Sequence, residues 1–275
     1  MAHVIRIDDP ADERVSDYIG LTDPDLRRRR EQAGGADGAF FIAEGVGVVR
    51  QLLRSTYRVR SLFLTPQRLA GLEPDLAGTD VPVYVAPQDV VNLVSGFPLH
   101  RGAIASAHRD PLPDAGAVAE GAQLLVVTEG INDHENLGAL FRNAAAFGAG
   151  GVVIDPTSAD PLYRRSVRVS MGQVLHVPFA RAAAWPGALD DLRRRGFEVL
   201  ALTPAPDADD LADVEPRPRQ ALLVGAEGPG LSAEALRAAD RRVRIPMATA
   251  VDSLNVATAA AIALHHLAGG SVRRR

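Results

Sequence analysis

Polar side chains that an apolar core does not need gather in three segments in the second half of the chain. These are 136–143 (NLGALFRN), 225–232 (GAEGPGLS) and 245–257, which contains DSLNVA. They hold amides, a guanidinium, a carboxylate and hydroxyls, groups that can grip a phosphate, order a ligand or move a proton. Each segment also has a structural interpretation, with Asn136 as a helix N-cap, Arg142 as a solvated helix residue and the glycines as a tight turn.

The glycine-rich segment 225–232 does not fit the common phosphate-binding loops. It lacks the Lys-Ser/Thr ending of a P-loop and the G-x-G-x-x-G spacing of a dinucleotide-binding fold. Glycines at 225, 228 and 230 instead leave the backbone open to close approach by a flat ligand. This arrangement suits an adenine or a ribose better than a pyrophosphate.

The composition excludes several classes of catalyst. All 30 basic residues are Arg, so the chain cannot form a Schiff base through Lys or build a P-loop. The absence of Cys excludes disulfides and thiolate chemistry, and the seven His show no metal-ligand spacing, so no metal is expected. With 34 acidic residues the net charge is −4, which argues against a uniformly basic nucleic-acid binder but allows a local basic patch.

The elements that position the three segments alternate between strands and helices. Apolar strand patterns occur near 124–130, 151–156, 174–180, 197–204, 221–228 and 241–247. Helical patterns occur near 137–147, 164–171, 188–195, 232–240 with Ser232 as N-cap, and 253–267. This order predicts an α/β fold with a parallel sheet covered by helices on both faces. Ligands of such sheets bind at the carboxyl ends of the strands, where the three segments lie.

The first 107 residues form a separate pattern of a smaller α/β unit. Strands are predicted near 40–42, 59–64 and 81–86, and helices near 46–53 and 87–96. The polar opening contains the run Arg27–Arg30, interpreted as a solvated helix face. The stretch HRDPLPDAGAVAEG has the composition of a linker. The predicted domains are therefore 1–107 and 121–275, joined by a linker at 108–120.

The chain has the composition of a soluble protein. Its 275 residues are 47% hydrophobic, enough for a substantial core. No uncharged apolar run reaches the roughly 18 residues that a membrane helix needs, and the N-terminus lacks the apolar core of a signal peptide. We therefore expect a cytoplasmic protein with no membrane association.

Taken in order, the three segments resemble the SpoU/TrmH-type RNA 2'-O-ribose methyltransferases of the SPOUT superfamily. The resemblance covers about 121–275 and rests on NLGALFRNAAAFGAGGVV, LLVGAEGPGLS and RIPMATAVDSLNVATAAAIAL, with SVRVSMGQVLHVPF between the first two. EGVGVVRQLLRSTYRVRSLFLTP resembles, more loosely, the N-terminal substrate-binding domain of the ribosomal-RNA members, which has a fold like a ribosomal RNA-binding protein. The resemblance implies a C-terminal trefoil knot near 225–260 and a homodimer in which both subunits contribute to one active site.

The resemblance also implies a cofactor, a reaction and site residues. S-adenosylmethionine would lie bent in the knot, held largely by the backbone of Thr203, Gly225, Ala226, Glu227, Gly228, Ile245, Met247 and Leu254. A methyl group would pass to a ribose 2'-hydroxyl of RNA, with ribosomal RNA favoured and tRNA as an alternative. The implied catalytic residues are Asn136, Arg142, Glu227, Ser253 and Asn255. A non-catalytic RNA-binding protein that kept the fold is the alternative from another class.

The roles of these residues stay open at the level of sequence. Arg142 matches the proposed catalytic Arg of the family, but a guanidinium with a pKa above about 12 is always charged. Gripping a phosphate and stabilising a developing alkoxide is an easier assignment, with the proton passing to water or phosphate. Ser253 and Asn255 could instead cap a helix, and Glu227 could fix its turn through backbone hydrogen bonds.

Contact with RNA and with a second subunit must rely on local surfaces. Guanidinium groups can bind phosphates and stack on bases, although solvated helix faces are the alternative. The candidates for RNA contact are Arg50, Arg54, Arg58 and Arg60 in the N-terminal unit, and Arg164, Arg165 and Arg168 near the active site. In the final helix, Ala257, Ala260, Ala261 and Leu264 could pack on a partner. Removal of residues 1–107 is expected to leave a folded domain that binds the cofactor but methylates RNA poorly.

Overall fold

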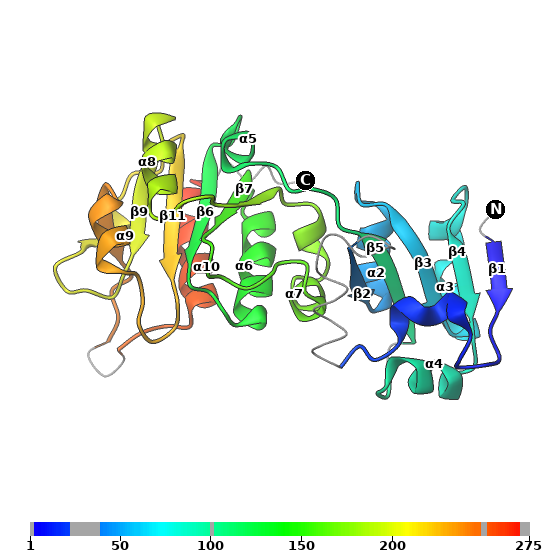
Figure 1. Cartoon of the computed structure of the whole chain (residues 1–275). Helices are drawn as coiled ribbons and strands as arrows, with labels where there is room; N and C mark the ends of the chain where they lie inside the picture. Colours follow the sequence, from blue (N-terminus) through cyan, green and yellow to red (C-terminus); the bar gives the residue numbers. More distant parts are fainter. Residues whose placement is uncertain (1–2, 23–38, 100–101, 249–251, 270–275) are drawn as a thin grey trace. The chain divides into compact units, whose positions relative to one another are not determined.

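The computed structural model describes residues 3–22, 39–99, 102–248 and 252–269. Contacts divide the chain into two compact units (Figure 1). Unit 1 comprises Met1–Pro111 and Leu162–Leu175, and unit 2 comprises Leu112–Pro161 and His176–Arg275. The predicted helix face Arg27–Arg30 lies outside the described residues. In the described ranges, no helix is long and apolar enough to span a membrane.

Unit 2 is built on a seven-stranded sheet in which every strand pair is parallel, as predicted. The strand order is β10-β12-β9-β11-β6-β7-β8. The strands are β6 (Leu124–Glu129), β7 (Gly151–Ile154), β8 (Phe179–Arg181), β9 (Glu198–Leu202), β10 (Asp209–Asp210), β11 (Gln220–Gly225) and β12 (Arg241–Arg244). The strand predicted near 174–180 is wrong over 174–178, because Gln173–Leu175 forms a 3-10 turn, η2, after positive φ angles at Met171 and Gly172, and β8 begins only at Phe179.

Helices cover both faces of this sheet, as predicted. Side chains alternate along the strands, so Leu125 and Val127 of β6 share a core with three helices, α5 (Ala115–Ala119), α8 (Gly187–Arg194) and α9 (Ala233–Ala238). On the other face α6 (His134–Ala146) and α10 (Val256–Leu267) pack side by side (Figure 1). Both of these helices begin at the carboxyl edge of the sheet.

The second half of the predicted linker is part of unit 2. Helix α5 begins after Asp114, whose side chain caps it by accepting a hydrogen bond from the Ala117 N–H at 2.8 Å. Val118 and Ala119 are buried in the core beneath it. The sequence does not predict α5, because two buried side chains in a five-residue helix are too few to form a recognisable helical repeat of apolar residues.

Unit 1 is a mixed α/β unit with the strand order β1-β4-β3-β5-β2, in which β5 is antiparallel to β3 and β2. Its strands are β1 (His3–Arg6), β2 (Phe40–Glu44), β3 (Val59–Leu64), β4 (Pro82–Val85) and β5 (Ala103–His108). Its helical elements are η1 (Glu13–Tyr18), α2 (Val46–Leu53), α3 (Pro66–Leu76), α4 (Gln88–Ser95), α7 (Arg164–Val169) and η2 (Gln173–Leu175). Helix α3 is not predicted, since its sequence starts at one proline and contains another, Pro74.

Helix α7 lies in unit 1, whereas the predicted domain boundary placed all of 121–275 in one domain. It packs on β2, and its Ser166 and Val167 are buried. Glu44 of β2 is also buried, and its carboxylate accepts hydrogen bonds from Arg164 at 2.8 Å and Arg168 at 3.4 Å. Because a buried carboxylate needs a cationic or hydrogen-bonding partner, this pairing ties segment 162–175 to unit 1.

A fragment that begins at Leu112 is therefore expected to be much less stable than the full chain. It would expose Val167 and leave Arg164 and Arg168 without the Glu44 carboxylate. Thermal unfolding followed by circular dichroism would compare the fragment with the full chain and with Glu44→Gln in the full chain. A fragment that unfolds as cooperatively, and at as high a temperature, as the full chain would restore the simpler two-domain division.

Candidate active site

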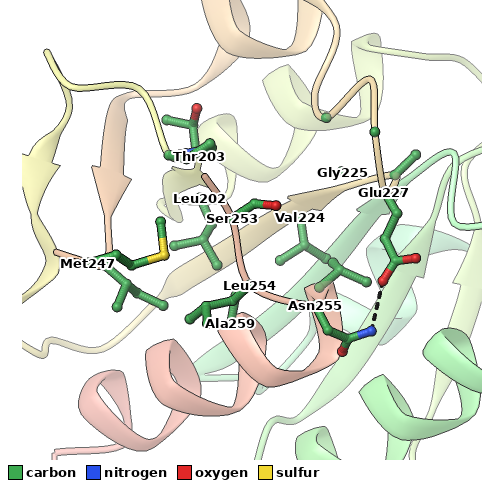
Figure 2. A pocket seen from close by; sticks show the side chains of 16 residues that line it. Leu202, Thr203, Val224, Gly225, Glu227, Met247, Ser253, Leu254, Asn255 and Ala259 are labelled. Carbon is green, nitrogen blue, oxygen red and sulfur yellow. Dashed lines mark hydrogen bonds between the residues drawn. The ribbon is translucent and has the colours of Figure 1, made fainter. Parts of the chain in front are cut away.

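A pocket of about 440 Å³ lies at the carboxyl end of the parallel sheet, where the fold places its ligand site (Figure 2). Its walls come from the segments that follow β9, β11 and β12 and from the start of α10. The structure brings all eight residues assigned to the cofactor by resemblance into this lining: Thr203, Gly225, Ala226, Glu227, Gly228, Ile245, Met247 and Leu254. Leu202, Pro204, Val224, Gly230, Val256 and Ala259 also line it and were not predicted.

The loop after β11 folds back on its own backbone. Gly230 N–H donates to the Ala226 carbonyl at 3.0 Å, and Gly228 and Gly230 have φ angles of +87° and +69°. A side chain at Gly225 would lie 2.5 Å from the carbonyl carbon of Gly230. Gly225 is therefore required by the turn itself, and the turn presents the backbone of 226–228 to the pocket.

Asn255 caps a helix and also contacts two of the other predicted catalytic residues. Its Oδ1 accepts hydrogen bonds from the backbone N–H groups of Ala257 at 3.0 Å and Thr258 at 3.2 Å, which caps α10. Its Nδ2 donates to Glu227 Oε1 at 2.7 Å and to Asn136 Oδ1 at 2.8 Å. The Asn255 Oδ1 must face the N–H groups at the start of α10 in order to cap it. The two hydrogens of Nδ2 therefore point away from the helix, toward Glu227 and Asn136. Figure 2 shows the bond to Glu227.

Asn136 is not the N-cap of α6. Asp133 has that role and accepts from the N–H groups of Glu135 at 2.7 Å and Asn136 at 2.9 Å, which leaves the Asn136 side chain for Asn255. Asn143 does not line the pocket, and the sequence did not predict its contact with α10. Its Nδ2 donates to the Ala257 carbonyl at 2.7 Å and holds α6 against the start of α10. The sequence offered one indication of this contact: Asn143 lies seven residues after Asn136, and helix residues seven apart share a face.

Of the other predicted catalytic residues, Ser253 and Glu227 line the pocket, whereas Arg142 does not. Ser253 lines the pocket but precedes α10 by three residues, so it does not cap that helix. Arg142 is exposed on α6, does not line the pocket, and forms no ion pair with any residue that the structure describes. Glu227 does not fix its turn, because its side chain bonds to Asn255 rather than to the backbone of the loop. Three of the five side chains thus form one hydrogen-bonded chain, from which Arg142 is separate.

All seven arginines predicted to contact RNA lie in unit 1. Several ion pairs hold them: Arg50 and Arg54 pair with Asp75, Arg58 with Asp110, Arg60 with Asp17, and Arg164 and Arg168 with Glu44. Arg60 also stacks on the Phe40 ring at 4.9 Å, and Arg165 is exposed on α7. Two guanidinium groups that share one carboxylate retain one positive charge, so the clusters at Asp75 and Glu44 are each locally basic.

Asp155 is a buried carboxylate outside the pocket lining, and the sequence did not predict its role. It follows β7, is 1% exposed, and accepts hydrogen bonds from the N–H groups of Gly130, Thr157 and Ser158 and from the hydroxyls of the last two. Burial raises the pKa of Asp155, but these hydrogen bonds outweigh it and bring the pKa below its usual value. Ser158 Oγ in turn accepts from the Ile131 N–H at 2.8 Å, so the network holds the loop that leads to α6 and Asn136.

The lowered pKa of Asp155 predicts a specific loss of stability in acid. A carboxylate whose pKa is lower in the folded state stabilises the fold above its unfolded pKa of about 4, and this contribution is lost as the pH falls through the folded pKa. Asp155→Asn is therefore expected to lower the melting temperature at pH 7 and to flatten its decline between about pH 5 and pH 2. Differential scanning calorimetry across that range would test this, with the exposed Asp190→Asn as control. An unchanged acid decline in Asp155→Asn would contradict it.

Comparisons with known proteins agree with this fold and site. Residues 123–265 match the SpoU rRNA Methylase family model. An uncharacterized tRNA/rRNA methyltransferase of Mycobacterium tuberculosis is 50% identical, over 96% of this chain and 93% of that protein. The 23S rRNA (guanosine(2553)-2'-O)-methyltransferase RlmP of Bacillus subtilis is 28% identical, over 83% of this chain and 88% of that protein. The crystal structure of an S-adenosylmethionine-bound rRNA methyltransferase from Sinorhizobium meliloti superimposes with a TM-score of 0.75 at 23% identity, over 96% and 97% of the two chains.

The parallel sheet and its carboxyl-edge pocket, together with these relatives, define an RNA methyltransferase. The chain belongs to the SpoU rRNA methylase family. The resemblance stated from its three motifs is thereby confirmed. In the part of the chain that the structure describes, no cluster of three or more His, Asp or Glu side chains could hold a metal ion.

Proposed function

We propose that this protein transfers a methyl group from S-adenosylmethionine to a ribose 2'-hydroxyl of ribosomal RNA. The observation that carries the proposal is the pocket, which gathers the eight residues assigned to the cofactor beside the chain of Asn136, Asn255 and Glu227. A volume of about 440 Å³ fits a ligand of this size, and the relatives that bind S-adenosylmethionine or methylate a ribose support the assignment. Such a substrate places the proposed reaction in the cytoplasm.

The residues of the pocket suit the two parts of this cofactor. When bound, S-adenosylmethionine supplies an electrophilic methyl group on a sulfonium. Ile245, Met247 and Leu254 offer apolar surface that would exclude water from an adenine ring, and the backbone of 226–228 offers hydrogen-bonding groups. Arg142 would grip a phosphate of the RNA and stabilise charge that develops on the ribose oxygen.

Three further features of the family belong to the same proposal. Unit 1 would bind RNA, and its mixed α/β fold supports the comparison with a ribosomal RNA-binding protein. The chain near 225–260 would form the trefoil knot. The enzyme would be a homodimer, which the separation of Arg142 from its own pocket supports.

Most of the α10 residues that were expected to contact a second subunit are not accessible to one. Ala257, Ala260 and Leu264 are buried within their own chain, because this face of α10 packs on α6 and the sheet. Ala261 is half-buried, and Ile262, which is 41% exposed, lies on the outer face. A partner would therefore meet α10 through the face that carries Ile262.

Methyl incorporation into defined RNAs would test the proposed function. Purified protein and radiolabelled S-adenosylmethionine would be incubated with in vitro transcripts of 23S rRNA, 16S rRNA and tRNA, followed by alkaline hydrolysis. We expect label in an alkali-resistant dinucleotide of 23S rRNA, because a 2'-O-methyl group blocks hydrolysis at its own nucleotide. Label in tRNA would favour the tRNA alternative. RNA binding without label, together with no cofactor binding by calorimetry, would favour the non-catalytic alternative.

Arg142→Lys tests whether the planar guanidinium matters. Lys keeps the charge but loses the fork that binds a phosphate through two parallel hydrogen bonds. We expect methyl transfer to fall by about tenfold or more, with cofactor affinity unchanged because Arg142 does not line the pocket. Single-turnover kinetics and calorimetry measure the two quantities. Turnover close to that of the wild type would remove the requirement for the fork.

A further inference from the structure

The hydrogen bond that holds the Glu227 carboxylate does not contribute to closing the loop in which Glu227 lies. The turn after β11 is closed by backbone contacts between Ala226 and Gly230, and Glu227 takes no part in them. Its side chain instead lines the pocket and is exposed. Its Oε1 accepts from Asn255 Nδ2 at 2.7 Å, and its Oε2 has no partner among the described residues. A carboxylate with one oxygen anchored and the other open to a pocket is suited to receive a proton.

The groups around Glu227 leave its charge uncompensated. No arginine among the described residues forms an ion pair with it. Glu129, at the end of β6, is occupied by hydrogen bonds from Trp185 Nε1 and from the N–H and hydroxyl of Ser232. Asp133 is occupied in capping α6, where His134 and Glu135 form the rest of the first turn. The donor that reaches Glu227 is therefore neutral, and Oε2 stays open to the pocket as an acceptor.

Arg142 is the poorer candidate for this step. A guanidinium is always protonated and has no acceptor atom. Arg142 also lies six residues after Asn136 on α6, about 240° around the helix, and outside the pocket lining. A single arginine would have to bind phosphate and also accept a proton. In this chain Arg142 suits the first function and Glu227 the second.

We propose that Glu227 accepts the proton of the ribose hydroxyl during methyl transfer, an inference that rests on the proposed function. The ribose oxygen forms a bond to the methyl carbon, and the carbon–sulfur bond breaks with its electron pair moving to sulfur, which becomes a neutral thioether. The hydroxyl proton passes to Glu227 Oε2 and then to water. Asn255 and Asn136 are positioning residues that orient the carboxylate.

Glu227→Gln tests this step with little change in shape. The amide oxygen of Gln can still accept from Asn255, but its nitrogen cannot accept a proton. We expect single-turnover methyl transfer to a 23S rRNA transcript to fall about hundredfold or more, the usual contribution of a general base. Calorimetry should show S-adenosylmethionine affinity within about threefold of the wild type, since a base acts on the transition state rather than on cofactor binding. The exposed Glu234→Gln on α9 is the matched control and should change neither quantity.

The pH profile separates a proton acceptor from a structural carboxylate. Between pH 5.5 and 8.5 the wild-type rate should show a plateau, because proton transfer to a carboxylate does not depend on the hydroxide concentration. The residual rate of Glu227→Gln should rise about tenfold per pH unit without levelling, because hydroxide replaces the base. Glu227→Asp should partly restore the rate and the plateau.

Three results would overturn the inference: a plateau in Glu227→Gln, a rate close to wild type, or a loss of cofactor affinity as large as the loss of rate. If Glu227→Gln does not fold, a Glu227→Asp profile without a plateau would overturn it equally. Absence of methyl transfer by the wild type to any of the transcripts would instead reject the proposed function. The two failures are therefore distinguishable.

Discussion

Asn255→Ala is expected to lower methyl transfer about hundredfold and to destabilise the fold at the same time. The substitution removes two hydrogen bonds from Nδ2, one of them to the Glu227 carboxylate, and bonds to a charged group contribute about 1.5–3 kcal/mol. About 1.4 kcal/mol corresponds to a factor of ten in rate. It also removes the cap of α10, which costs about 1 kcal/mol of the free energy of unfolding.

Asn255→Ser separates the two contributions. Ser caps a helix as well as Asn does, but its single hydroxyl is too short to bridge Glu227 and Asn136. We expect a melting temperature close to the wild type and methyl transfer nearly as low as in Asn255→Ala. Thermal unfolding and single-turnover kinetics on the same preparations would test this, with Asp114→Ala, which removes the cap of α5, as the control for loss of a cap elsewhere. Normal methyl transfer by Asn255→Ser would show that the Nδ2 bonds are dispensable.

Gly225→Ala is expected to abolish cofactor binding, with a loss of at least about a hundredfold in affinity. The added methyl group would lie 2.5 Å from the Gly230 carbonyl carbon and 2.6 Å from its oxygen, and no flexible side chain is available to move aside. The loop must therefore open, and opening it displaces the backbone of 226–228 from the pocket. This predicted loss is larger than that of a single hydrogen bond, because several contacts change together.

Calorimetric titration with S-adenosylmethionine measures this loss directly. Gly187→Ala is the matched control in the same unit, because a methyl group there meets its nearest neighbour at an ordinary 3.9 Å. The control should bind as the wild type does. Cofactor affinity within tenfold of the wild type in Gly225→Ala would contradict the proposed role of the turn.

The amino-acid sequence by itself determined the sheet, the edge at which the site lies and most of the pocket lining. Apolar strands such as 221–225 alternate with helices, and this pattern requires a parallel sheet whose carboxyl ends meet at one edge. Local chemistry also identified Ser232 as an N-cap, because a cap depends on residues within one turn. Each of the three motifs is contiguous and follows a strand, and this is why the sequence could place all three at the same edge of the sheet.

Tertiary structure alone decided which side chains act on one another. Asn255 meets Asn136 across 119 residues of sequence and Glu227 across 28, and this is what makes it both a cap and a site residue. Gly225 is required by backbone at Gly230, and Arg164 is held by a buried carboxylate 120 residues away, which draws segment 162–175 into unit 1. Periodicity and capping report on neighbours within a few residues, whereas burial, ion pairing and the direction of an amide depend on distant segments that only the folded chain brings together.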